Sequence, residues 1–215
     1  MRLRIYSIPL ATIFFLLAAI SSHASEKITD FGGIRPPADA PYPAIWAYTA
    51  GAYPIIHREE SARADAIRLQ LAAELAQLPA APGEAWHGGC VSAEELAQME
   101  IGRTKTFRFL STTKIPAIAA NYASVRFGQR GGTCRPIILK MNQSTGRDIK
   151  PYSVFPDEQE ILLGAADSFE VAARLPNSSL PEDIRSFLER QQRLQEFSFI
   201  ELVQVAPTGE GPASR

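Results

Sequence analysis

The sequence has few of the residues that mark metal-binding or disulfide-rich proteins. It contains only two cysteines and three histidines in 215 residues, and their spacing matches no zinc site. Lysine and arginine number 22 against 23 aspartates and glutamates, so the chain lacks the basic excess that draws proteins onto nucleic acid. The few cysteines and histidines therefore predict that the protein has no structural zinc ion, and the balanced charge predicts that it has no nucleic-acid partner.

Long apolar runs are also scarce. The clearest one, residues 13–20, follows two arginines and precedes a small-residue motif that ends at Ala24, which is the pattern of a secretory signal. An uncleaved anchor is the alternative, but a spanning helix needs about 20 apolar residues. We therefore expect residues 1–24 to be a signal peptide and the mature protein to be secreted or periplasmic, without stable membrane insertion.

Export changes how the two cysteines are interpreted. An oxidising compartment permits a disulfide between Cys90 and Cys134, whereas two buried thiols are the alternative. Closing this loop would stabilise the fold by about 4 kcal/mol in the chain-entropy model. The pairing requires the two Cα atoms to lie within about 7 Å of each other.

The length and the 46% hydrophobic content suit one compact domain. Residues 25–43 are rich in proline and glycine and predict an irregular lead-in, and residues 206–215 predict a flexible tail. Residues 44–205 form the predicted domain. Its first helical signal begins near Ala44, and the apolar spacing in residues 61–78 predicts an amphipathic helix.

The remainder of the domain reads as short strands with two helices between them. Six segments bounded by turn residues predict a mainly antiparallel sheet: 84–91, 106–112, 133–142, 159–163, 168–173 and 197–205. The helices are predicted around 115–124 and 181–195. The fold class is therefore α+β.

A pair of glutamates stands where one of these strands begins. If Glu158 and Glu160 belong to the strand, they point to the same face about 6.5 to 7 Å apart. Their mutual repulsion would raise the pKa of one carboxyl toward a range that suits a general base. Alone, such a pair is most often a solvated strand face, so its meaning depends on the neighbouring residues.

Those neighbours, residues 153–163, run from a serine through an aromatic residue and a proline to the glutamate pair, and then into a hydrophobic segment. Several further segments precede them: Ala44-Ile45-Trp46, Tyr48-Thr49, Tyr53, Ile56-His57, Phe109-Leu110-Ser111-Thr112-Thr113 and Asn121-Tyr122-Ala123. In content and order, these segments closely resemble the arginine-specific mono-ADP-ribosyltransferases, in which a Glu-x-Glu pair follows the same serine, aromatic and proline pattern.

The resemblance implies a split pair of small, mainly antiparallel sheets flanked by helices, which grip NAD without a metal. It implies that Glu160 binds the nicotinamide ribose and stabilises the cation that forms as nicotinamide leaves. Glu158 would orient and deprotonate the acceptor guanidinium. Ser111 would hold Glu160 and the ribose in register, with Thr112 and Thr113 lining the same strand.

One position departs from the family. His87 stands where the family has an arginine that binds the NAD phosphates, and neutral imidazole lacks that charge. Three readings remain open: Arg126 or Arg130 replaces the arginine, His87 instead binds the adenine-side ribose as in the branch that carries histidine there, or the enzyme is degenerate. The following pair, Gly88 and Gly89, would let the nucleotide approach the backbone.

The expected function is that of a secreted mono-ADP-ribosyltransferase. It would transfer ADP-ribose from NAD to an accessible arginine of an acceptor protein, with NAD hydrolysis as a side reaction. The alternatives are a noncatalytic secreted binding module on the same fold and an NAD glycohydrolase.

Overall fold

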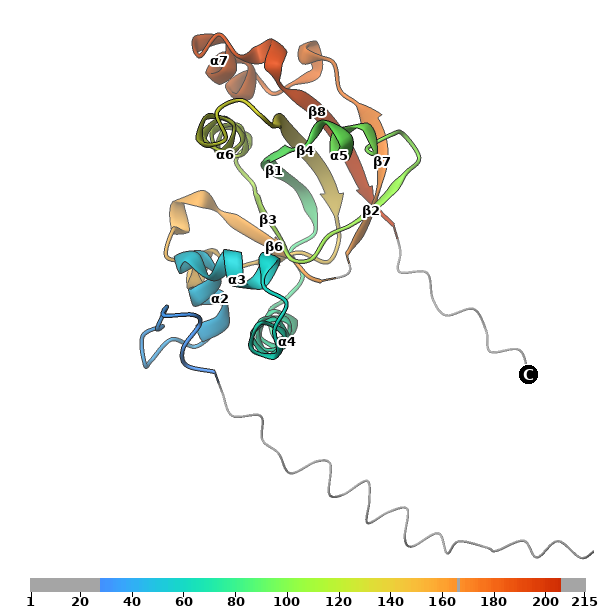
Figure 1. Ribbon diagram of the computed structural model, residues 1–215. Coiled ribbons are helices and arrows are strands. Elements are labelled where there is room, and N and C mark those ends of the chain that lie inside the picture. Colours follow the sequence, from blue (N-terminus) through green and yellow to red (C-terminus); the bar gives the residue numbers. More distant parts are fainter. Residues whose placement is uncertain (1–27, 166, 206–215) are drawn as a thin grey trace, which may run out of the picture.

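The computed structural model describes residues 28–165 and 167–205 (Figure 1). The predicted signal peptide and the predicted tail lie outside these residues. Within them, no helix is both long enough and apolar enough to span a membrane.

The chain first forms a group of helices that packs below the sheet in Figure 1. They are α2 (Pro43–Ala47), the π-helical turn η1 (Tyr48–Ala52), α3 (Tyr53–Arg58) and α4 (Ala62–Ala76). The predicted helix at 61–78 is thus present, with the Ser61 side chain capping its N-terminus. The buried Glu74 accepts hydrogen bonds from the backbone N–H groups of Ala44 and Ile45 at 2.9 and 3.0 Å, and so joins α4 to α2.

The described residues contain eight strands: β1 (Gly83–Val91), β2 (Thr104–Thr106), β3 (Leu110–Thr113), β4 (Arg135–Gln143), β5 (Arg147–Asp148), β6 (Glu160–Leu163), β7 (Ser168–Arg174) and β8 (Ser198–Gln204). They form one hydrogen-bonded sheet in the order β2-β7-β8-β4-β1-β3-β6-β5. Among these neighbours, β4 and β8 are parallel and the other pairs are antiparallel, and β1 and β3 share a single residue pair, Trp86 with Thr113. The sheet therefore divides into two parts between β1 and β3, as expected for the α+β split-sheet fold.

The strand predicted over residues 106–112 is not continuous: residue 106 ends β2, and residues 110–112 belong to β3, in a different part of the sheet. β2 pairs with β7, whereas β3 pairs with β6. The chain changes direction at Phe109, which is 1% exposed and has φ of 50°. Positive φ is uncommon outside glycine, so a phenylalanine gives little sequence signal for a turn. The short helix α5 (Ala93–Ala97) and the two-residue β5 were not predicted either.

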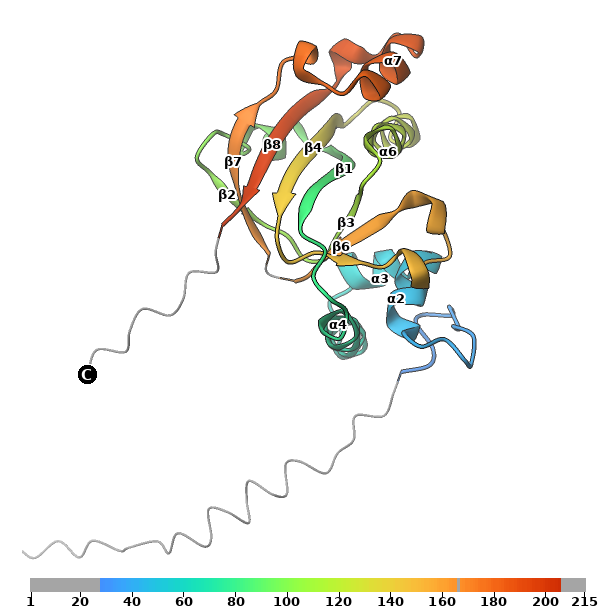
Figure 2. The same ribbon diagram turned by 180° about the vertical axis from the view of Figure 1, so that it is seen from behind.

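Helices α6 (Pro116–Gln129) and α7 (Glu182–Arg190) cover one face of β1, β4 and β8 (Figures 1 and 2). A methyl group at Gly88 of β1 would lie 1.7 Å from the carbonyl oxygen of Ala119 in α6. The absence of a side chain at Gly88 thus lets the helix approach the strand, and the predicted approach of a nucleotide to Gly88 stays a prediction. This close contact fixes α6 over β1.

A disulfide joins Cys90 in β1 to Cys134, which lies between α6 and β4. The two Cα atoms are 5.6 Å apart, within the distance that the pairing requires. The crosslink attaches the chain that leaves α6 to the same strand that carries His87.

Candidate active site

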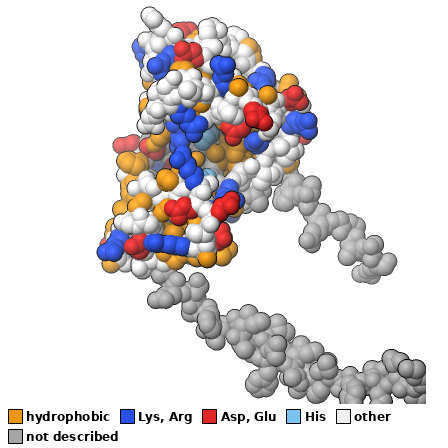
Figure 3. Space-filling view, in the orientation of Figure 1, with side chains coloured by type: hydrophobic (Ala, Val, Ile, Leu, Met, Phe, Trp, Pro, Cys, Tyr) orange, Lys and Arg blue, Asp and Glu red, His pale blue; other side chains and the backbone are white. Residues whose placement is uncertain are grey.

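A cleft lies between the N-terminal helices, α6 and the junction of the two sheet parts, and the empty space in and above it, open solvent included, is about 810 Å³. Figure 3 shows a histidine inside a hollow on this face, with basic side chains beside it. Of the residues predicted for the site, the cleft is lined by Glu160, Glu158, Ser111, His87, Gly88, Thr112, Thr113 and Arg126.

Glu160 is the buried acid of this cleft. It is the first residue of β6, pairs with Thr113 of β3, and is 5% exposed. Its Oε1 accepts a hydrogen bond from the Ser111 hydroxyl at 2.5 Å. Burial raises the pKa of Glu160 to about 7, the Ser111 hydrogen bond opposes this, and the charge of Glu158 adds to it. Burial is thus the main cause of the raised pKa, and the predicted repulsion between the two glutamates is a smaller contribution.

Glu158 is not part of the strand, and that sequence prediction is wrong. It ends a 3₁₀ turn, Pro156–Glu158, and Gln159 follows in the left-handed region with φ of 46° and ψ of 50°. The alternation of side chains applies only within a continuous strand, so the expected spacing of 6.5 to 7 Å does not follow. Both carboxylates nevertheless line the same cleft.

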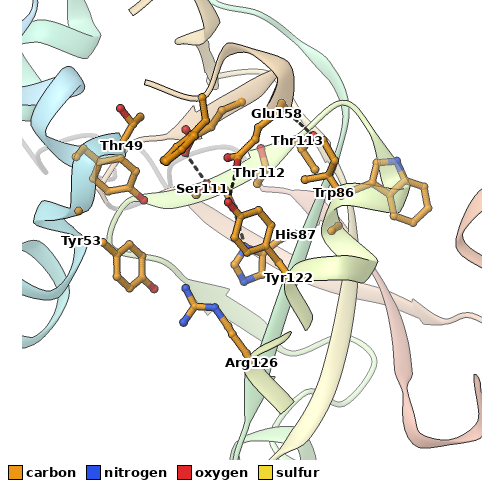
Figure 4. A pocket seen from close by; sticks show the side chains of 17 residues that line it. Thr49, Tyr53, Trp86, His87, Ser111, Thr112, Thr113, Tyr122, Arg126 and Glu158 are labelled. Atoms are coloured by element: carbon orange, nitrogen blue, oxygen red, sulfur yellow. Dashed lines mark hydrogen bonds between the residues drawn. The ribbon is translucent and has the colours of Figure 1, made fainter. Parts of the chain in front are cut away.

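A residue of α6 holds the side chain of Glu158 by a hydrogen bond. Its Oε1 accepts a hydrogen bond from the Tyr122 hydroxyl at 2.5 Å (Figure 4). Burial and this hydrogen bond raise the pKa of Tyr122, so the phenol remains a donor near neutral pH. The sequence alone gave Tyr122 no role beyond its place in the family pattern, because its approach to Glu158 depends on how α6 packs.

His87 presents a hydrogen-bond acceptor to the cleft. Its Nδ1 lies 2.7 Å from the carbonyl oxygen of Ser111. A carbonyl only accepts, so Nδ1 carries the proton and Nε2 of the neutral ring has a free lone pair. Burial lowers the pKa of His87 to about 4, the Ser111 hydrogen bond opposes this, and the charge of Arg126 lowers it further. Gly89 leaves room for the ring, since a methyl group there would lie 3.0 Å from Nε2.

Arg126 supplies positive charge to the cleft. It lies one helical turn beyond Tyr122, and its guanidinium carbon is 5.4 Å from the centre of the Tyr53 ring (Figure 4). It has no hydrogen bond or ion pair with any residue in 28–165 or 167–205. Arg130, the other arginine considered from the sequence, follows the end of α6 and does not line the cleft.

The two threonines after Ser111 use their hydroxyls to hold the backbone. Thr112 donates to the carbonyl oxygen of Ile161 at 2.7 Å, and Thr113 donates to that of Glu158 at 2.6 Å. Both side chains are buried. They therefore fasten β3 to β6 and to the turn that carries Glu158.

Aromatic residues from the N-terminal helices complete the cleft. Tyr53 stacks on His57 with ring centres 3.9 Å apart, and Tyr48 is 4% exposed with no hydrogen-bond partner for its hydroxyl among the described residues. Burial and the charge of Glu160 raise the pKa of Tyr48. Tyr48 and Tyr53 were noted for the family resemblance, but their place in the cleft depends on how the helices pack on β3.

The sequence matches no described protein family and no curated protein. Among solved structures, the Vis toxin, an ADP-ribosyltransferase from Vibrio splendidus, has a TM-score of 0.57 at 16% identity, over 79% of this chain and 74% of that one. Exoenzyme S from Pseudomonas aeruginosa has a TM-score of 0.54 at 16% identity, over 80% of this chain and 82% of that one. The effector XopAI from Xanthomonas axonopodis has a TM-score of 0.52 at 19% sequence identity, and this chain spans 65% of the length of XopAI.

The chain has the ADP-ribosyltransferase fold. At such low sequence identity, the structural similarity establishes the architecture, including the split sheet of this α+β fold. It does not establish the reaction, which has to be inferred from the site. In this ADP-ribosyltransferase fold, the cleft brings together the buried Glu160, the turn that carries Glu158 and the neutral His87.

The raised pKa of Glu160 predicts that the residue lowers stability at alkaline pH. Between the ordinary carboxyl pKa and about 7, the folded state binds a proton that the unfolded state has released, so stability falls as pH rises. The difference corresponds to about 3 kcal/mol. Glu160→Gln is therefore expected to raise the free energy of unfolding at pH 8 by about 3 kcal/mol.

Urea denaturation at pH 4.5 and pH 8 measures this effect. The increase in the free energy of unfolding caused by Glu160→Gln should almost disappear at pH 4.5, where Glu160 of the folded wild-type protein is protonated. Glu170→Gln, an exposed carboxylate on β7, is the matched control and should show no comparable gain. The same stability difference at both pH values would contradict the assignment of a raised pKa to Glu160.

Proposed function

We propose that this protein is a mono-ADP-ribosyltransferase that transfers ADP-ribose from NAD to an arginine side chain of an acceptor protein. The observation that carries the proposal is the pairing of a buried carboxyl, Glu160 bonded to Ser111, with a second carboxylate, Glu158, in one cleft. The fold neighbours agree with it: Vis has been solved in complex with agmatine, and exoenzyme S has been solved bound to carba-NAD. Agmatine carries the guanidinium group of arginine.

The two carboxylates suit the two halves of this reaction. The bond between the nicotinamide nitrogen and ribose C1′ breaks, and nicotinamide leaves with the electron pair. Ionised Glu160 stabilises the positive charge that develops on the ribose. A guanidinium nitrogen of the acceptor then bonds to C1′ and gives a proton to Glu158. Water in place of the guanidinium would yield free ADP-ribose, which accounts for NAD hydrolysis as a side reaction.

His87 and Arg126 would divide the binding of NAD between them. The free lone pair on His87 Nε2 suits a ribose hydroxyl, which can donate to it, and does not suit a phosphate oxygen. Arg126 has a permanent charge, lines the cleft and lacks an acidic partner among the described residues, so it suits the diphosphate. This division accounts for the absence of the family's arginine on β1.

Substitution of the two residues should separate their roles. Arg126→Ala is expected to raise the KM for NAD about tenfold to a hundredfold, since a charged hydrogen bond contributes about 1.5 to 3 kcal/mol. The penalty should shrink at high salt, because screening already weakens the native contact. His87→Ala should also raise KM, about tenfold, but with little dependence on salt.

Arg130→Ala is the matched control, because it removes the same charge from the residue that follows α6, outside the cleft. Steady-state nicotinamide release at two salt concentrations makes the comparison. If Arg130→Ala raises KM as much as Arg126→Ala does, the phosphates are not bound where we propose.

Labelled NAD tests the proposed function itself, when mixed with the purified protein and either agmatine or a cell lysate. Transfer predicts labelled agmatine and at least one labelled protein band. Release of free ADP-ribose with no labelled acceptor would identify an NAD glycohydrolase. Binding of NAD by calorimetry without nicotinamide release would identify a noncatalytic module.

Export belongs to the same proposal. We infer that residues 1–24 direct secretion, that cleavage follows Ala24, and that the exported protein acts as a toxin or effector without a metal. The intact mass of the exported protein decides the cleavage site.

A further inference from the structure

The backbone that carries Glu158 is fixed to β3. The Thr113 hydroxyl donates to the Glu158 carbonyl oxygen at 2.6 Å, and the Lys114 N–H donates to that of Gln159 at 3.3 Å. These bonds hold the turn, but they do not determine where the Glu158 side chain points. A glutamate side chain has three rotatable bonds, so its carboxylate needs a contact of its own.

That contact comes from Tyr122. The phenol hydroxyl donates to Oε1 of Glu158, and no lysine or arginine of the described residues lies within ion-pair distance of this carboxylate. Oε2 therefore keeps its lone pairs for another donor. Figure 4 shows Tyr122 reaching Glu158 from the opposite side of the cleft, away from the turn.

The helix behind Tyr122 is rigidly placed. Ala119 and Ala123 of α6 are buried, and Gly88 of β1 leaves no space between helix and strand. Tyr122 itself is 39% exposed. The contact thus joins a flexible side chain on a turn to a helix that is packed against the larger part of the sheet.

We propose that Tyr122 is a positioning residue that holds the Glu158 carboxylate in the orientation in which it receives the acceptor guanidinium. This inference rests on the proposed function. Tyr122 holds one carboxylate oxygen and leaves the other exposed to the acceptor. Tyr122 does not itself take the proton, because its phenol remains protonated near neutral pH.

Tyr122→Phe tests the proposal, since it removes only the hydroxyl from a partly exposed ring. We expect kcat/KM for transfer to agmatine to fall about tenfold, as for one hydrogen bond to a charged group. The ratio of transfer to NAD hydrolysis should fall as well, because Glu158 acts on the acceptor alone. In a Glu158→Gln background, Tyr122→Phe should cause no further loss. Tyr42→Phe, outside the cleft, is the matched control.

A second measurement does not depend on turnover. In protein with ¹³C-labelled glutamate, the Glu158 side-chain signal, assigned by its loss in Glu158→Gln, should shift or broaden in Tyr122→Phe and not in Tyr42→Phe. An unchanged signal would overturn the proposal even if the wild-type protein transferred nothing to arginine. Equal loss of transfer and hydrolysis, or additive losses in the double variant, would also overturn it. Absence of wild-type transfer together with a shifted signal would reject the proposed function and retain the Tyr122–Glu158 coupling.

Discussion

Replacing Glu160 with glutamine is expected to lower both transfer and NAD hydrolysis by about a hundredfold to a thousandfold, the usual cost of removing one preorganised electrostatic group. Both reactions need the bond from nicotinamide to ribose to break, and Glu160 is the buried acid in the cleft that can stabilise the resulting charge. Glutamine keeps the size of the side chain and can still accept the Ser111 hydrogen bond, so the loss reports the charge.

The pH dependence of the wild-type enzyme should agree with this result. Because burial raises the pKa of Glu160 to about 7, the charged form increases as pH rises through 7, and kcat/KM for NAD, which reports the free protein, should rise with it. Nicotinamide release measured from pH 5.5 to 8.5 gives the profile. Glu170→Gln should keep both the rate and the profile, since this residue is exposed on β7 away from the cleft. A Glu160→Gln enzyme that still hydrolyses NAD at the wild-type rate would remove Glu160 from the mechanism.

Replacing Glu158 with glutamine should instead separate the two reactions. Transfer to agmatine is expected to fall by about a hundredfold, within the range of 10² to 10⁴ for loss of a general base. NAD hydrolysis should persist, because in the proposed mechanism Glu158, on the turn outside β6, acts on the acceptor, whereas Glu160, in β6, acts on nicotinamide departure.

Parallel assays with labelled NAD, with and without agmatine, provide the comparison. Asp157→Asn is the matched control, because Asp157 is an exposed carboxylate on the same turn and does not line the cleft. If Glu158→Gln and Glu160→Gln reduce both reactions equally, the division of roles between the two carboxylates is wrong.

Much of the architecture could be predicted from the sequence, because the patterns that indicate helices and strands are local in the chain. The apolar spacing around Ile67 and Leu71 predicted the helix that forms α4, and hydrophobic segments predicted β1, β4, β6, β7 and β8 within a few residues. The prediction failed between residues 104 and 113, where a buried phenylalanine with positive φ separates two strands. Its burial, which comes from the fold as a whole, overrides the local preference of the residue.

For the site, the sequence by itself determined which chemical groups are available: the carboxylates of Glu158 and Glu160, the hydroxyl of Ser111 and the imidazole of His87. Only the tertiary structure decided what they do. Burial raised the pKa of Glu160, a left-handed Gln159 took Glu158 off the strand, and packing of α6 placed Arg126 in the cleft and Arg130 outside it. Burial, tautomer and proximity depend on residues distant in the chain, and local patterns do not contain that information.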